Sequence, residues 1–170
     1  PPVKVGVPVT DIMAGTLATV GILGALIRRG VTGKGQSVDT SLFEAGIMLT
    51  YLQSAIHLAS GAVPGAMGSG HPVMAPYQAF RCADGWIIIG AGNQRNWLKL
   101  VDCLEAPELA ADPRFAESGE RMEHLDELVA ALDDILARRP GAEWLERLEA
   151  AGIPSGPVLD VAGMATDPQT

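Results

Sequence analysis

Asp11 is the residue whose type and position could do chemistry. It begins a predicted helix and is followed by residues 12–27, which carry no charge and include three glycines, the first of them Gly15. Asp is favoured at helix N-termini, so a plain capping role is one interpretation. The other is a buried reactive group, because backbone N–H groups and the positive helix end keep a carboxylate ionised. Beside glycines that leave room for an acyl group, such a carboxylate suits attack on a thioester carbonyl.

The histidines and a glycine-bearing segment are weaker candidates. His71 follows Gly68-Ser69-Gly70 in what we expect to be a flexible loop, where its side chain could approach a substrate. We expect His57, on an apolar stretch, to be a core or interface residue and His124, on an acidic one, to be solvated. Gly68-Ser69-Gly70 precedes no convincing helix and therefore does not predict a phosphate site. Tyr77 is a further substrate-binding candidate, although its pattern fits a core position equally.

Composition limits the classes of function. With 48% hydrophobic residues in 170, the chain can form a globular core. Its net charge of −8 argues against nucleic acid as a partner, since binding to phosphates needs clustered Lys and Arg. Cys82 and Cys103 have no disulfide or metal-site spacing, and this favours a reduced, cytoplasmic chain.

No targeting or membrane segment is predicted. The start, Pro1-Pro2-Val3-Lys4, lacks the layout of a signal peptide, and the missing initiator Met indicates a cut or partial chain. The apolar run at 12–27 is shorter than the roughly 18–20 residues that cross a bilayer. We therefore expect a buried helix and no membrane partner.

The first part of the chain must position Asp11. An extended entry over 1–9 leads to a helix capped by Thr10 or Asp11, which runs to about Arg29 and stops at Gly30. Apolar residues cover every face of this helix, so it should lie inside a larger assembly. The next elements are a turn over 32–36, a short strand over 37–40 and a second apolar helix over 41–59.

The second part differs in composition. Residues 1–60 hold four basic and three acidic residues, whereas residues 61–170 hold eight and seventeen. Together with the Gly- and Pro-rich stretch over 61–76, this shift predicts two regions. Beyond it we expect a β-hairpin around Asp84-Gly85, a helix capped by Asn93, an amphipathic helix over 118–139, a short helix around Trp144 and a strand near 155–158. All three tryptophans should be core, and no element is predicted to close the chain.

The order of these segments resembles the family III CoA-transferases, which include formyl-CoA transferase, carnitine CoA-transferase and the α-methylacyl-CoA racemases. The resemblance covers nearly the whole chain. In the first half it is carried by Asp11-Ile12-Met13-Ala14-Gly15 and by residues 21–26 and 32–42. In the second half it is carried by His71-Pro72, Gly92-Asn93, Glu143-Trp144 and residues 76–80, 83–85, 112–115 and 152–158.

The resemblance implies an α/β fold with a Rossmann-like large domain and a small α+β domain, in an interlocked homodimer. Family members are more than twice this long, so the chain would hold the central part. Residues 1–62 would belong to the large CoA-binding domain and its connecting helix, and residues 63–170 to the small domain. Asp11 would be the nucleophile toward an acyl-CoA, with a carboxylic acid as acceptor and with no metal or cofactor. Gly68, Ser69 and Gly70 would form the loop that closes over the site, beside the other substrate-binding candidates Gly15, His71 and Tyr77.

Two alternatives remain. The racemases pair this Asp with a preceding histidine, which residues 1–10 lack, and they differ over 76–78 and 92–94, so a transferase is favoured. The chain could instead be a noncatalytic dimerisation segment, because the CoA-binding half is missing. The Gly-Ser-Gly segment is also shorter than the glycine run of formyl-CoA transferase, and this predicts substrates other than oxalate and formyl-CoA.

Overall fold

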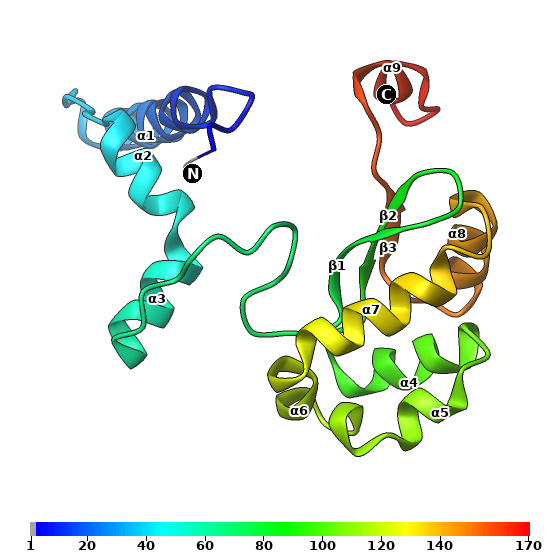
Figure 1. Ribbon diagram of the computed structural model, residues 1–170. Coiled ribbons are helices and arrows are strands. Elements are labelled where there is room, and N and C mark those ends of the chain that lie inside the picture. Colours follow the sequence, from blue (N-terminus) through cyan, green and yellow to red (C-terminus); the bar gives the residue numbers. More distant parts are fainter. Residues whose placement is uncertain (1–2) are drawn as a thin grey trace. The chain divides into compact units, whose positions relative to one another are not determined.

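The computed structural model describes residues 3–170 and divides the chain into two compact units, Pro1–Gly65 and Ala66–Thr170 (Figure 1). The predicted extended entry starts at residues 1 and 2, which lie outside the described part, and residues 3–8 form neither helix nor strand. The assignment of the two regions to the large and small domains of a family fold stays a prediction.

The first unit begins with α1, Val9–Thr32, which starts earlier and ends later than the sequence indicated. Its N-cap is Pro8, and no side chain caps it, so the predicted capping role of Thr10 or Asp11 is wrong. Its C-terminal stop is Gly33, whose φ of 70° is left-handed and whose N–H donates to the Arg29 carbonyl at 2.8 Å. The predicted stop at Gly30 is wrong because the left-handed cap that ends a helix is formed three residues later.

The surface of α1 is apolar and open within this unit. Ala14 is its one buried residue, while its large apolar side chains are mostly exposed: Ile12, Val20, Ile22, Leu23, Leu26, Ile27 and Val31. The helix is thus open within the described part of the chain, and its expected burial inside a larger assembly stays a prediction. At 24 residues, α1 is also long and apolar enough to cross a membrane by length and composition, so the expectation that it is too short is wrong.

Two shorter helices follow, α2 at Leu42–Leu49 and α3 at Tyr51–Ser60. The hydroxyl of Ser41 accepts from the Glu44 N–H at 3.1 Å, which confirms the predicted helix start. The single helix expected over 41–59 is broken at Thr50, whose hydroxyl donates to the Ile47 carbonyl. The strand expected over 37–40 is absent, and this segment instead packs on α1, where Val38 occupies the space that a side chain on Gly21 would need.

The second unit is built on a three-stranded antiparallel sheet, β1 (Tyr77–Arg81), β2 (Trp86–Gly90) and β3 (Ser155–Pro157), in that order (Figure 1). The hairpin and the late strand confirm the predictions. Ile87 and Ile89 of β2 are buried, so the alternation of a strand turns Trp86 outward, where it is 51% exposed. The prediction that Trp86 is core is therefore wrong.

Helices make up the rest of this unit, and of these α7 packs on β1 and α8 on β2 and β3. In chain order the helices are α4 (Gln94–Cys103), α5 (Pro107–Ala111), the 3-10 turn η1 (Pro113–Phe115), α6 (Ser118–Glu123), α7 (Leu125–Leu136), α8 (Gly141–Ala150) and α9 (Val161–Thr166). The core gathers the apolar side of each layer: Phe80, Ile87, Ile89, Trp97, Leu100, Leu128, Leu132, Leu136, Trp144 and Leu148. This amphipathic packing is what the sequence pattern predicted.

Helix boundaries in this unit partly differ from the prediction. Asn93 caps α4, as expected, by accepting from the Asn96 N–H at 2.8 Å. The helix expected over 118–139 is two helices, because His124 leaves helical geometry between α6 and α7, and it ends at Leu136. The chain also has a closing element that was not predicted, since Asp160 caps α9 by accepting from the Gly163 N–H.

An ionic cluster at the surface of this unit gives a pH prediction. Hydrogen bonds from Arg114 hold the pKa of the Asp112 carboxyl below its ordinary value of 3.8. Because the folded pKa is the lower one, the stabilising effect of Asp112 is complete above about pH 4 and is lost as the pH falls through the folded value. We expect Asp112→Asn to lower the melting temperature slightly at pH 7, and the difference from wild type to shrink toward pH 2 in a thermal melt series. A difference that stayed constant with pH would contradict this.

Candidate functional site

Asp11 is an exposed carboxylate in the first turn of α1. It is the third residue of the helix, and the Thr10 hydroxyl donates to its Oδ2 at 3.4 Å. Neither alternative from the sequence describes it, since it is neither a cap nor buried within its unit. The free N–H groups of a first helical turn favour an acidic residue, so this position suits an accessible carboxylate.

An apolar hollow lies near the start of α1. Its volume is about 370 Å³ and its lining residues are Thr10, Leu42, Phe43, Gly46, Ile47 and Thr50, so Asp11 itself does not line it. One turn further along α1, Gly15 is exposed and has no atom within 4 Å of where a side chain would begin. The predicted role of Gly15, to leave space beside the carboxylate, therefore agrees with the geometry of this unit.

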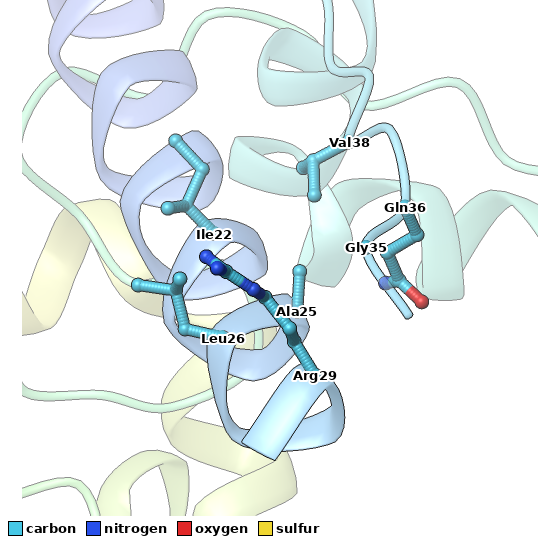
Figure 2. Close-up of a pocket in the computed structure, with 7 residues that line it drawn as sticks. All are labelled: Ile22, Ala25, Leu26, Arg29, Gly35, Gln36 and Val38. Atoms are coloured by element: carbon cyan, nitrogen blue, oxygen red, sulfur yellow. The ribbon is translucent and has the colours of Figure 1, made fainter. Parts of the chain in front are cut away.

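A second cavity lies toward the other end of α1. Figure 2 shows its seven lining residues, Ile22, Ala25, Leu26, Arg29, Gly35, Gln36 and Val38, around a volume of about 280 Å³. Eleven residues separate Asp11 from Ile22, which corresponds to roughly 16 Å along a helix. This cavity is thus too far from the carboxylate to hold an atom that reacts with it.

The Gly68-Ser69-Gly70 segment is anchored on β1. Gly68 has a φ of 61°, which favours glycine, and the Gly70 N–H donates to the Met67 carbonyl at 3.0 Å. The Ser69 hydroxyl accepts from the Ala79 N–H at 3.1 Å. The predicted flexible loop is therefore a turn whose hydrogen bonds fix it to the first strand.

His71 and Tyr77 form the adjoining surface. Their rings stack with centroids 5.2 Å apart, and the His71 N–H donates to the Tyr77 carbonyl at 2.9 Å. His71 Nδ1 accepts from the Val73 N–H at 3.3 Å, which leaves Nε2 as the ring nitrogen free for another partner. Tyr77 is 42% exposed and so faces the loop, which settles the two positions that its pattern allowed.

The structure thus brings five of the predicted substrate-binding residues together in the second unit: Gly68, Ser69, Gly70, His71 and Tyr77. Asp11 and Gly15 belong to the first unit. Of the remaining histidines, His57 is exposed and its Nδ1 lies 2.9 Å from the Ala62 carbonyl oxygen, so it is not in the core of its unit, and the interface position expected as the alternative stays a prediction. His124 is partly exposed beside Glu127, in agreement with a solvated position.

Sequence reasoning missed Arg121, which is fully buried in the second unit. Its Nε donates to the Ala75 carbonyl at 2.9 Å and its Nη1 to Gln94 Oε1 at 2.9 Å. Burial lowers the pKa of its guanidinium, and the charges of Glu117 and Glu120 oppose that effect. A signal was present, because Arg121 precedes Leu128 by two helical turns on the apolar side of the 118–139 pattern.

Comparisons with known proteins agree with this architecture. The family model described as CoA-transferase family III matches residues 1–170. Acetyl-CoA:oxalate CoA-transferase of Acetobacter aceti is 42% identical over 173 residues, covering 100% of this chain and 44% of that protein. Succinyl-CoA:glutarate CoA-transferase of Mus musculus is 32% identical over 168 residues, which cover 99% of this chain and 38% of that protein.

Solved structures show the same fold. A CAIB/BAIF family protein from Brucella suis superposes with a TM-score of 0.77 at 39% identity, and Rv3272 from M. tuberculosis with 0.86 at 27%. Each comparison covers 99% of this chain and 44% of the other. The predicted fold class, part of a larger α/β CoA-transferase fold, is confirmed, and the chain spans less than half the length of the relatives it matches. With the family model matched from end to end, the chain belongs to CoA-transferase family III.

Proposed function

We propose that the complete protein containing this chain transfers coenzyme A from an acyl-CoA to a carboxylic acid, with Asp11 as the nucleophile. Membership of the family is the observation that carries the reaction class. The assignment to Asp11 is supported by its exposed carboxylate and by its place in the first turn of α1. The relatives named above are transferases, which favours transfer over racemisation.

The reaction can be written with Asp11 alone. A carboxylate oxygen of Asp11 attacks the thioester carbonyl, the C–S bond breaks, and CoA leaves as a thiolate, so that a mixed anhydride of Asp11 and the acyl group remains. The thiolate then attacks the Asp11 carbonyl carbon, which releases the donor acid and leaves an aspartyl thioester. The acceptor carboxylate attacks this thioester and displaces the thiolate, and the thiolate takes the new acyl group and frees Asp11.

Both intermediates would be hydrolysed if water reached them, so the site must exclude water during turnover. We infer that the Gly68-Ser69-Gly70 turn, with His71 and Tyr77, binds substrate groups. Its anchoring on β1 supports this role, because a fixed turn holds substrate groups more accurately than a mobile one.

The acceptor class follows from the relatives. They are named for oxalate, glutarate and, in Haloarcula hispanica, mesaconate, all of which are small dicarboxylic acids. We propose a small dicarboxylate as acceptor. The expectation against oxalate, which came from the short glycine segment, stays a prediction, and oxalate is included in the test.

The function is tested by assaying the complete protein with acetyl-CoA and succinyl-CoA against a panel of monocarboxylic and dicarboxylic acids, oxalate among them. Formation of a new acyl-CoA, followed by liquid chromatography, is the expected result with at least one dicarboxylate. Proton exchange at the α-carbon of a branched acyl-CoA without transfer would favour a racemase, and no reaction at all would favour a noncatalytic segment.

We also propose a cytoplasmic homodimer that needs no metal or redox cofactor. The exposed apolar face of α1 supports a larger assembly, because so many exposed large apolar side chains on one helix mark a surface that another segment covers. Light scattering on the complete protein should give twice the mass of one chain, and activity should persist after dialysis against a chelator.

A further inference from the structure

The starting point is the environment of Arg121. Within residues 3–170 it is the one charged side chain whose exposure is 0%. Its Nη1 also donates to the Phe115 carbonyl at 3.0 Å, and its guanidinium carbon lies 5.2 Å from the centre of the Trp97 ring. The charge is therefore held by carbonyl oxygens and an aromatic face, and not by a carboxylate.

This is a costly way to fill a core. Removing a guanidinium from water is unfavourable, and good packing by an apolar residue of similar volume often stabilises a protein as well or better. In addition, Arg121 Nη2 makes no hydrogen bond with the described residues, so one of the nitrogen donors of the buried guanidinium is unsatisfied. What an apolar residue could not do is bind the backbone carbonyls that Arg121 joins.

The carbonyl of Ala75 connects Arg121 to the substrate-binding turn. Ala75 is buried, and the next carbonyl, that of Pro76, accepts from the Ala91 N–H at 2.9 Å. Tyr77 follows at the start of β1, paired with Gly90, and its carbonyl accepts from His71. The guanidinium is thus connected to His71 by two hydrogen bonds, one at Ala75 and one at Tyr77, which the covalent backbone of residues 75–77 joins.

The same segment is confined from its other side. A side chain on Gly92 would begin 2.6 Å from Cβ of Met74, closer than real contacts allow. Residues 74–76 therefore lie between the guanidinium of Arg121 and the backbone at 91–92. Because Ala75 and Pro76 are buried, a displacement of Arg121 would be transmitted along the backbone to Tyr77.

We propose that Arg121 is a positioning residue for the substrate-binding turn. Through its hydrogen bond to the Ala75 carbonyl it holds His71 and Tyr77 in position, and it does not touch the substrate. The proposal rests on the proposed function for its catalytic consequence, and on hydrogen bonds alone for its structural one. Lys in its place keeps the charge but is a point donor, which cannot reach Ala75, Gln94 and Phe115 together.

The structural half is tested by hydrogen exchange on the complete protein. In Arg121→Lys, the amides of His71, Ala79 and Ala91 should exchange about tenfold faster or more, since local opening then costs less than global unfolding. The control is Leu132→Ala, a core change in the same unit that takes no part in the connection from Arg121 to His71. The variants are compared at temperatures equally far below their melting points. Under these conditions the control should not selectively raise the exchange rates of those three amides. Equal loosening in both variants would overturn the proposal.

The catalytic half is tested by steady-state kinetics on the same proteins. Arg121→Lys should lower kcat by about tenfold or more with a small change in KM for the acyl-CoA, because misplaced groups cost rate more than binding. Leu132→Ala and the surface change Arg138→Met should keep kcat near wild type. If wild type transfers CoA and Arg121→Lys keeps its full kcat, the result contradicts the positioning role of Arg121 and leaves the proposed function supported. If wild type transfers no CoA, the result contradicts the proposed function, and the hydrogen-exchange result alone decides whether Arg121 holds the turn in position.

Discussion

Asp11→Asn in the complete protein should lower the rate of CoA transfer by about a thousandfold or more, because an amide cannot supply the attacking oxygen and the covalent route is lost. The side chain keeps its size, and Asp11 makes no contact with the core of its unit. Circular dichroism and the melting temperature should therefore stay close to wild type. The measurement is kcat/KM with the donor and acceptor pair that gives the fastest wild-type turnover.

The matched control is Asp126→Asn. Asp126 is also an exposed carboxylate in the first turn of a helix, α7, so the change removes the same charge from the same kind of position. Its activity should equal that of wild type. If Asp11→Asn retained near wild-type turnover, the carboxylate would be an ordinary first-turn acid and not a nucleophile.

Trp144→Ala should lower the free energy of unfolding of the second unit by about 3–5 kcal/mol. Trp144 is 2% exposed, its Nε1 donates to the Leu136 carbonyl at 2.9 Å, and the guanidinium groups of Arg139 and Arg147 lie over its ring. Truncation therefore removes a buried ring and leaves the Leu136 carbonyl with only the longer hydrogen bond from the Arg139 N–H, at 3.4 Å. Urea unfolding followed by tryptophan fluorescence reports this unit specifically, because all three tryptophans belong to it.

Two further substitutions separate the contributions. Trp144→Phe keeps most of the ring and loses the hydrogen bond, so a loss of about 1–2 kcal/mol is expected. Trp86→Ala should change stability by only about 0.5 kcal/mol, since this ring is half exposed on the outer face of the sheet. Equal losses from Trp86→Ala and Trp144→Ala would contradict the assignment of the core to one side of the sheet.

The second unit could be predicted well because its signals are local. An Asp-Gly turn between two apolar runs, an Asn cap and a helical spacing of leucines each specify an element from a few neighbouring residues. The errors there have particular causes. Trp86 was expected to be core from its size, whereas the alternation of β2 decides its side. The helix break at His124 could not be predicted because no Gly or Pro lies at that position.

The first unit shows what local signals leave out. The helix start at Val9 has no side-chain cap, so the acid at Asp11 gave a false boundary. The strand expected over 37–40 was overridden by packing of Val38 against Gly21, a contact that no periodicity predicts. Most large apolar side chains of α1 are exposed within this unit, and the chain spans less than half the length of the relatives it matches.

For the candidate site, the residue types could be predicted but not their surroundings. Asp11, His71 and Tyr77 were chosen from sequence, and the structure adds the stacking of the two rings and the anchoring of the turn. Arg121 was missed because arginines on amphipathic helices are usually solvated, and its burial depends on carbonyls far away in the sequence, such as that of Ala75.

The most direct test of the central claim is to trap the covalent intermediate on Asp11. The complete protein is mixed with its acyl-CoA donor without acceptor, quenched in acid, and mapped by peptide mass spectrometry. We predict a mass increase equal to the acyl group or to CoA on the peptide that holds Asp11, absent in Asp11→Asn and present in Asp126→Asn. An adduct on any other residue, or none during active turnover, would contradict the account.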